Sequence, residues 1–436
     1  MGAIGLEKNT VLQSRAGKVR IDSYLTQGGQ GEVYAVELNG RKYALKYYHK
    51  KLCTRALRSN IEYLIANPIK SKSFAWPKYL VDGGDRFGYI MELIPDGYHN
   101  VSEWIGGSIN TTLEVLIRAC IGIADDFQLL HQEQLSYKDI SPSNVYFNPE
   151  TGDTLIIDND NITKNLGFIG MKGTPSYMAP ELVLAKRRDP TRITDLHSIA
   201  TLFFQMLCIE HPLHGKKEYN ISYQESEEKI ARELYAPENA CFIFKDASNL
   251  DRYIEPSEEA HQNAKELWQM YPQFIRELFE RAFVQGVIAP YKRPTASEWK
   301  DAFVKLLASL YQCPSCNMPH FYNHEEFCRK SNGAPVCKKC GISTFFPRIK
   351  IGENIVVLGD STKLYSAYFD KYARDIFNEL IVTEFKDGRL YFKSNSRVKM
   401  EYKGKAVRFG AKIGPILSGD FITVDKKQYF IKGEML

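Results

Sequence analysis

The fold is decided by LSYKDISPSN, residues 135–144, and by LIIDND, residues 155–160. In the first segment, Asp139 stands five positions before Asn144. In the second, Asp158 closes a short apolar run of the kind that forms a buried strand. A single acidic residue is usually a solvated surface group. The meaning of these residues therefore depends on what lies before and after them in the chain.

Three further segments flank this pair. LTQGGQGEVY, residues 25–34, lies between two strand-like runs, where glycines let backbone N–H groups close over phosphates. Taken alone, this segment fits a glycine-bearing hairpin turn better. YALK follows it at residues 43–46, and GTPSYMAPE lies beyond the acidic segments at residues 173–181. It is the order of all five segments that carries information.

Hydrophobic patterning around the segments predicts an α+β fold. Strand-like runs dominate residues 19–93 and are interrupted by one helix-length stretch at 54–66. Apolar residues at helical spacing then predict helices at 111–131, 195–208, 271–285 and 295–311. Residues 216–269 are charged and weakly patterned, so we treat them as an insertion. Short strand-like runs separated by turn residues return beyond residue 347.

Together the five segments resemble the motifs of eukaryotic-like (Hanks-type) protein kinases, namely GxGxxGxV, VAIK, HRDxxxxN, DFG and APE. The resemblance covers about residues 19–310 and implies a bilobal kinase fold. We expect an N-lobe at 1–94 and a C-lobe at 95–310, with the insertion at about 216–269.

The resemblance also implies roles for single residues. Asp139 would accept the proton of a substrate hydroxyl, while Asn144 and Asp158 would hold Mg²⁺. Lys46 would pair with the phosphates of ATP, held by an ion pair with Glu62. The expected nucleotide contacts are Thr26, Gln27, Gly28, Gly29, Gly31, Val33, Ala44, Lys46, Glu62, Met91, Glu92 and Ile94.

Three supporting contacts follow from the same resemblance. Asp195 would brace the catalytic loop from the start of a long helix, and Arg293 would pair with Glu181. Thr174 would hydrogen-bond near Asp139 and marks a Ser/Thr kinase. The stretch between Asp158 and Glu181, which corresponds to the activation segment of kinases, carries candidate phosphorylation sites, but lysine at Lys138, where arginine is usual, weakens the anchor that would hold a phosphate. The candidate sites are Thr163, Thr174, Ser176 and Tyr177.

The sequence departs from the family at Tyr137, Ser141, Asn159 and Asp160. A pseudokinase scaffold is therefore a competing interpretation, although Lys46 and the other residues that do chemistry are all present. The variants DISPSN and DND are most similar to an atypical bacterial branch. In that branch the kinase accompanies a PP2C-type phosphatase and a von Willebrand factor A-domain protein in tellurium-resistance-type stress systems.

Four cysteines predict a zinc ribbon at residues 311–346. Cys313 and Cys316 form one CxxC pair, and Cys337 and Cys340 form another after a spacing of 20 residues. Two such pairs present four thiolates to one Zn²⁺ and leave no open coordination position, so we expect a structural metal. His320, His324 and Cys328 lie between the pairs and are alternative ligands.

The remaining residues, 347–436, predict a β-rich domain, either a barrel or a sandwich. From residue 311 onward there are 21 Lys and Arg against 13 Asp and Glu, a net charge of +8, whereas the total is only +5. A nucleic-acid-binding regulator is thus an alternative, but docking of a protein partner is favoured because stacking aromatics are not interleaved. The longest apolar run is too short to span a membrane and no secretory signal is visible, so we expect a cytoplasmic protein.

Overall fold

The computed structural model describes residues 5–164, 173–184, 189–214, 226, 229, 242–244, 259–323, 336–343 and 346–432. Most of the predicted insertion at 216–269 lies outside these residues. The chain divides into two compact units, Met1–Ala264 with Leu278–Ser297 and Lys265–Glu277 with Glu298–Leu436. Among the described residues, no helix is both long and apolar enough to cross a membrane.

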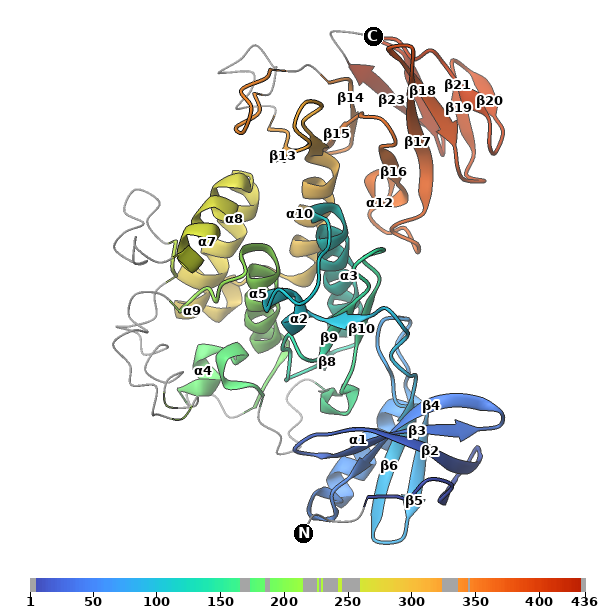
Figure 1. Cartoon of the computed structure of the whole chain (residues 1–436), viewed down its shortest axis with the longest axis vertical. Helices are drawn as coiled ribbons and strands as arrows, with labels where there is room; N and C mark the ends of the chain where they lie inside the picture. Colours follow the sequence, from blue (N-terminus) through green and yellow to red (C-terminus); the bar gives the residue numbers. More distant parts are fainter. Residues whose placement is uncertain are drawn as a thin grey trace. The chain divides into compact units, whose positions relative to one another are not determined.

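The first unit begins with a closed six-stranded barrel in the order β1-β2-β3-β4-β6-β5 (Figure 1). Its inward side chains form one apolar core that includes Val19, Val36 and Leu45. Gly31 is required at the start of β3, because a Cβ there would lie 2.2 Å from the Tyr47 carbonyl oxygen. The strands are β1 (Val11–Ser14), β2 (Gly17–Gln27), β3 (Gly31–Leu38), β4 (Arg41–Tyr48), β5 (Tyr79–Gly83) and β6 (Arg86–Met91).

Helix α1 (Arg55–Ala66) is the single long helix among the described residues of this N-terminal part. Thr54 caps it, because its side chain accepts a hydrogen bond from the Leu57 N–H. Leu57, Ile61 and Leu64 are buried, and their spacing fixes the helix face that contacts the barrel.

The rest of the first unit is mainly helical and is centred on α3 (Leu113–Gln132) and α5 (Arg192–Cys208). Fifteen of the residues of α5 are buried, which explains why consecutive apolar residues such as Leu202, Phe203 and Phe204 occur in it. Short elements precede and follow α3, and some of them carry the acidic segments. They are α2 (Val101–Ile105), β7 (His99–Asn100), β8 (Leu135–Ser136), β9 (Val145–Phe147), β10 (Thr154–Ile156), η2 (Asn159–Asn161), β11 (Thr163–Lys164), η3 (Pro175–Tyr177) and α4 (Pro180–Val183).

The later helices belong partly to each unit. They are α7 (Glu259–Met270), α8 (Gln273–Glu280), η6 (Arg281–Gln285), α9 (Gly286–Ile288), η7 (Pro290–Lys292) and α10 (Ala296–Ser309). Tyr271 contacts Phe321 with ring centroids 5.7 Å apart, and Lys300 donates a hydrogen bond to the Lys371 carbonyl. The predicted division at residue 310 therefore differs from the compact units and stays a prediction.

The second unit continues into a cysteine-bearing hairpin and two open sheets. One sheet has the order β15-β14-β23-β22-β19-β20 and the other β16-β17-β18-β21, and neither closes into a barrel over the described residues. The α+β fold with a β-rich end is confirmed. The elements are β12 (Leu310–Gln312), β13 (Pro319–Phe321), β14 (Arg348–Ile351), β15 (Asn354–Val357), β16 (Lys363–Tyr365), α12 (Ser366–Phe369), β17 (Glu379–Lys386), β18 (Arg389–Ser394), β19 (Met400–Tyr402), β20 (Lys405–Val407), β21 (Lys412–Ile413), β22 (Phe421–Val424) and β23 (Lys427–Lys432).

Candidate active site

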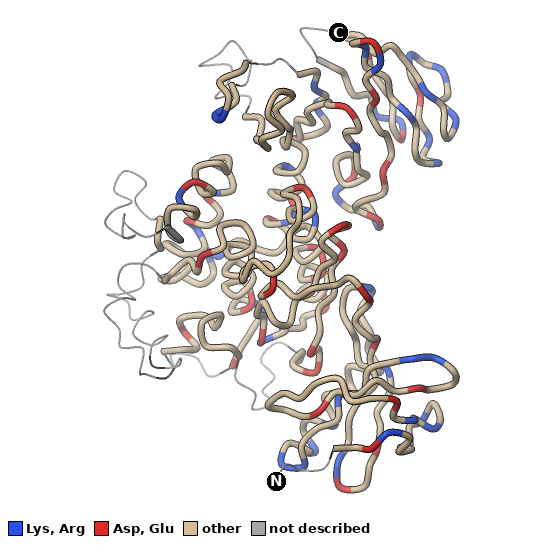
Figure 2. Tube along the Cα trace, viewed as in Figure 1, with Lys and Arg blue, Asp and Glu red and all other residues tan. Residues whose placement is uncertain are grey.

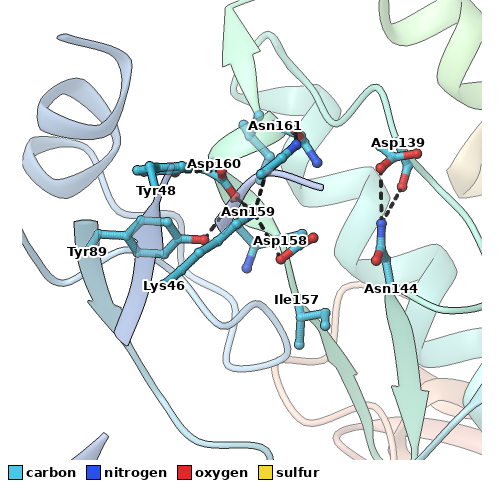
Figure 3. A network of polar contacts seen from close by, with 12 residues as sticks. Lys46, Tyr48, Tyr89, Asp139, Asn144, Ile157, Asp158, Asn159, Asp160 and Asn161 are labelled. Atoms are coloured by element: carbon cyan, nitrogen blue, oxygen red, sulfur yellow. Dashed lines mark hydrogen bonds and ion pairs between the residues drawn. The ribbon is translucent and has the colours of Figure 1, made fainter. Parts of the chain in front are cut away.

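Lys46, near the end of β4, is buried among polar groups. Its ammonium lies 3.1 Å from the Asp158 carboxylate and 3.0 Å from the Asp160 carboxylate (Figure 3). It also donates to Gln30 Oε1 at 2.6 Å, which brings the glycine-rich loop to the site. Burial alone would lower the pKa of Lys46, but the two carboxylates outweigh it and the pKa is raised. The lysine is therefore a fixed cation.

Asp139 and Asn144 form the second part of the site. The Asn144 amide donates to the Asp139 backbone carbonyl at 3.0 Å and to its carboxylate at 3.3 Å (Figure 3). The Thr174 N–H and hydroxyl donate to Asp139 Oδ1 at 2.9 and 3.0 Å. The predicted contact between Thr174 and Asp139 is thus confirmed. Three donors orient this one carboxylate.

Asp195 braces the loop that carries Asp139, as the sequence predicts. It lies in the first turn of α5, is 1% exposed, and accepts the backbone N–H groups of Tyr137 at 2.8 Å and Lys138 at 3.1 Å. Lys138 has a φ of 75°, a strained backbone conformation for a residue with a side chain. The two hydrogen bonds hold this strained turn in place.

A second brace is the ion pair of Arg293 with Glu181. Two guanidinium nitrogens contact the carboxylate at 2.8 and 2.7 Å, and the Arg293 side chain is fully buried. Arg293 also donates to the Gly286 and Ile193 carbonyls at 3.0 Å, so each of its three guanidinium nitrogens has an acceptor. This predicted pair is confirmed.

The prediction for Glu62 is wrong. Glu62 pairs with Arg58 on the same helix at 3.2 Å, and its side chain is 47% exposed. The reason is helix phase: Ile61 is fully buried, and the next residue is turned by about 100° away from the core. Asp160 provides the carboxylate that Glu62 does not. Sequence reasoning treated Asp160 as a mere departure from the family, and its only signal was its place two residues after Asp158.

The other expected nucleotide contacts lie on the barrel strands and the segment after β6. Ala44 and Met91 are buried register partners on β4 and β6, and Val33 is half-buried on β3. Thr26 and Gln27 are exposed at the end of β2, where the Gly28 N–H donates to the Gly31 carbonyl at 2.9 Å. A Cβ on Gly28 or Gly29 would meet nothing within 4 Å. Glu92 pairs with Lys78 at 2.5 Å, and Ile94 is 37% exposed.

The site fits magnesium-bound ATP. Asp158 has a side chain that is 30% exposed, and burial raises its pKa although Lys46 opposes that effect. Carboxylate and amide oxygens are the ligands that Mg²⁺ prefers, and Asp158 with Asn144 supplies them. The open glycine loop and the buried ammonium of Lys46 suit an anionic phosphate chain.

The four predicted zinc ligands also come together. The sulfur atoms of Cys313, Cys316, Cys337 and Cys340 all lie within 4.8 Å of one another. The Cys313–Cys340 and Cys316–Cys337 sulfur pairs are 3.6 Å apart, close to the roughly 3.8 Å edge of a tetrahedron with zinc–sulfur bonds of about 2.3 Å. Each CxxC turn closes with the same backbone bond, from the Asn317 N–H to the Cys313 carbonyl and from the Gly341 N–H to the Cys337 carbonyl.

Of the three alternative metal ligands, the structure describes only His320. His320 is buried, and its Nε2 lies 3.2 Å from the Cys337 sulfur, so it contacts one of the four cysteines. Backbone N–H donors, with that of Cys340 foremost, lower the pKa of the Cys337 thiol to about 5. His324 and Cys328 lie outside the described residues.

Comparison with known proteins agrees with this geometry. The family model "Protein kinase domain" matches residues 20–301. A probable myosin light chain kinase of Dictyostelium discoideum is 23% identical over 46% of this chain and 63% of its own length. Human serine/threonine-protein kinase 10 is 27% identical over 49% of the chain and 24% of its own length. G protein-coupled receptor kinase 1 of Caenorhabditis elegans is 26% identical over 48% and 34%. The chain thus spans less than two thirds of each of these relatives.

Proposed function

Since the chain belongs to the protein kinase domain family, we propose that it transfers the γ-phosphoryl group of ATP to serine or threonine hydroxyls of a protein partner. The observation that supports this best is the pairing of an oriented Asp139 with a metal-ligand set and a buried Lys46 in one unit. Relatives named as serine/threonine kinases support the choice of hydroxyl.

In this proposal Asp139 accepts the proton of the attacking hydroxyl. Its carboxylate is held by Asn144 and Thr174, so it does not have to be ordered when substrate binds. Asn144 and Asp158 would hold Mg²⁺, which supplies charge neutralisation to the phosphates when bound. Lys46 adds a fixed positive charge where the phosphate chain would lie.

The pseudokinase alternative rests on the residues that depart from the family motifs. Two of them, Tyr137 and Asn159, form hydrogen bonds beside Asp158. The Tyr137 hydroxyl donates to the Ile157 carbonyl, directly before Asp158, and the Asn159 amide donates to the Ile156 carbonyl at 3.0 Å. Both contacts hold the strand end that presents Asp158. The substituted residues therefore stabilise the segment that carries the proposed metal ligand Asp158, which favours an active enzyme.

We further propose that the four cysteines hold one structural Zn²⁺ and that the C-terminal sheets dock a partner. Figure 2 shows Lys and Arg along these sheets. Part of this charge is neutralised locally, since Lys403 pairs with Asp420 at 2.8 Å and Lys412 with Glu384 at 2.6 Å. This favours a protein over a nucleic acid, whose binding relies on unpaired cations. A cytoplasmic location stays part of the proposal.

From the resemblance to the tellurium-resistance-associated branch, we propose a von Willebrand factor A-domain protein and a PP2C-type phosphatase as partners. The deciding experiment incubates the full chain with labelled ATP and Mg²⁺, alone and with such proteins encoded beside it, and maps phosphosites by mass spectrometry. We expect label on serine or threonine. If nucleotide binds but no protein is labelled under any of these conditions, the scaffold alternative replaces the enzyme.

A further inference from the structure

The carboxylate nearest to Lys46 in the interior is Asp160, which lies on the turn η2 and has a fully buried side chain. Its Oδ1 accepts hydrogen bonds from Lys46 at 3.0 Å and from the Tyr89 hydroxyl at 2.9 Å. Its Oδ2 accepts one from the Tyr48 hydroxyl at 2.6 Å (Figure 3). One cation and two neutral donors therefore converge on this side chain from β4 and β6.

This arrangement satisfies the condition for burying a charge. An ionised carboxylate inside a protein is costly unless it is both paired and hydrogen-bonded. Burial, and secondarily the nearby Asp160, raises the pKa values of Tyr48 and Tyr89 well above the usual range, so both hydroxyls keep the protons that they donate. Both tyrosines therefore remain hydrogen-bond donors to Asp160.

Helix α1 supports the turn without supplying a charge. The Asn60 amide donates to the Asp160 backbone carbonyl at 3.2 Å and to the Ile162 carbonyl at 2.9 Å. Glu62 points to the exposed Arg58, which also binds Asp82 at 2.6 Å. The helix therefore fixes the backbone of η2, whereas the acidic group that meets Lys46 belongs to η2 itself.

We propose that Asp160 is the positioning residue of Lys46, in the place that an acidic residue of α1 would otherwise fill. The inference rests on the proposed function. Asp158 is partly exposed and is the carboxylate that Mg²⁺ would engage, whereas Asp160 is fully buried and already accepts three donors. Asp160 thus keeps the Lys46 ammonium in place when Asp158 turns to the metal. The lysine partner and the metal ligand then lie on one turn, so no carboxylate from α1 is needed to assemble the site.

The test measures the dissociation constant of Mg-ADP by calorimetry and the steady-state kinetics of full-length variants. Asp160→Asn keeps the shape of the side chain and one oxygen acceptor for a tyrosine hydroxyl but removes the charge. The variant loses the charge-assisted hydrogen bond between Lys46 and Asp160. We therefore expect Mg-ADP to bind about 10- to 100-fold more weakly and kcat/KM to fall at least as much. Glu62→Gln should change either quantity by less than about twofold, because its partner is solvent-exposed. Equal losses in the two variants would overturn the inference.

A double-mutant cycle separates positioning from a general structural role. In a Lys46→Met background, Asp160→Asn should add no further loss of Mg-ADP affinity, because its effect passes through the lysine. A further loss as large as in the wild type would overturn the inference. If Asp160→Asn does not fold, the Tyr48→Phe and Tyr89→Phe double variant tests the same network, because it removes the two hydroxyl donors to Asp160. It should weaken Mg-ADP binding by about 3- to 10-fold, and unchanged binding would count against the network.

The two proposals fail in different ways. If wild-type protein binds Mg-ADP but labels no protein, while Asp160→Asn binds it more weakly, the proposed function fails and the positioning role stands. If wild type and Asp160→Asn bind Mg-ADP equally, the positioning role fails whatever the turnover is.

Discussion

The phosphoryl-transfer site and the cysteine cluster both present metal ligands, but the protein supports them in opposite ways. The first is braced by the buried Asp195 and by the bidentate pair of Arg293 with Glu181. The second lies beside a small apolar group centred on Tyr311, Tyr322 and Val357. The groups that brace the first site are not metal ligands themselves. In the second, the four sulfur atoms lie on two short turns, each closed by a backbone hydrogen bond.

This difference predicts what each proposed metal would do. Removing Mg²⁺ from the first site should stop chemistry and leave the fold intact, because the braces do not involve the metal. Removing Zn²⁺ from the second should unfold its segment, since a piece of this size cannot build a sufficient core from side chains alone. Variants at the two sites should therefore separate turnover from local stability.

The largest loss of turnover is expected for Asp158→Ala, which removes a proposed metal ligand and one of the two carboxylates that contact Lys46. Turnover should be abolished, and Mg²⁺ should no longer increase the stabilisation by nucleotide. At a ligand concentration of about 100 times the dissociation constant, binding stabilises a protein by about 2.7 kcal/mol, which a thermal-shift assay detects. An unchanged shift with Mg-ATP would remove Asp158 from the metal site.

Asp139→Asn should lower kcat by roughly 10²–10⁴-fold, the usual contribution of a general base. Binding of Mg-ATP should stay close to that of wild type, because Asn144 and Asp158 are the proposed metal ligands. Rapid-quench kinetics and calorimetry on the same preparation measure both. Full activity in this variant would exclude Asp139 as the base, while a lost affinity would show that it also shapes the metal site.

A smaller effect is expected for Thr174→Ala, which removes the hydroxyl donor to Asp139 and leaves the backbone N–H donor in place. A hydrogen bond to a charged group contributes about 1.5–3 kcal/mol, and because the backbone N–H donor remains we expect the lower end of that range, a roughly 10-fold loss of kcat/KM. Thr174→Ser keeps the hydroxyl and serves as the matched control. A loss as great as that of Asp139→Asn would mean that the hydroxyl takes part in chemistry.

Motif spacing predicted the catalytic-loop side of the site well. Asp195, Arg293 with Glu181, and Thr174 with Asp139 all make the contacts expected from the resemblance. These contacts involve segments whose positions the motifs fix, and whose long helices carry a clear apolar period. The predicted helix at 111–131 and the observed α3 at Leu113–Gln132 differ by only one or two residues at the ends.

The lysine side was predicted less well, because partner choice depends on helix phase and on packing between distant segments. A rotation of one residue takes α1 from the buried Ile61 to the exposed Glu62. Asp160 meets Lys46 across more than a hundred positions of sequence, which no periodicity reveals. The strand β1 lies before the strand-rich stretch predicted at residues 19–93, since a run of four residues carries too little pattern to predict.

The smallest change in turnover is expected where the structural change is largest, in the Cys337→Ser and Cys340→Ser double variant. Losing two of four thiolates should release the metal, measured as zinc per chain by elemental analysis, and should expose the segment around residues 311–346 to protease. Phosphoryl transfer to a generic substrate should stay within about twofold of wild type, because the catalytic residues belong to the other compact unit and are braced independently. Cys208→Ser is the matched control, since Cys208 is a buried cysteine of the first unit and should leave the zinc content unchanged. Protein purified without chelator that contains no zinc would refute the metal site, and loss of all basal transfer in the double variant would show that the cysteine segment is part of the catalytic unit.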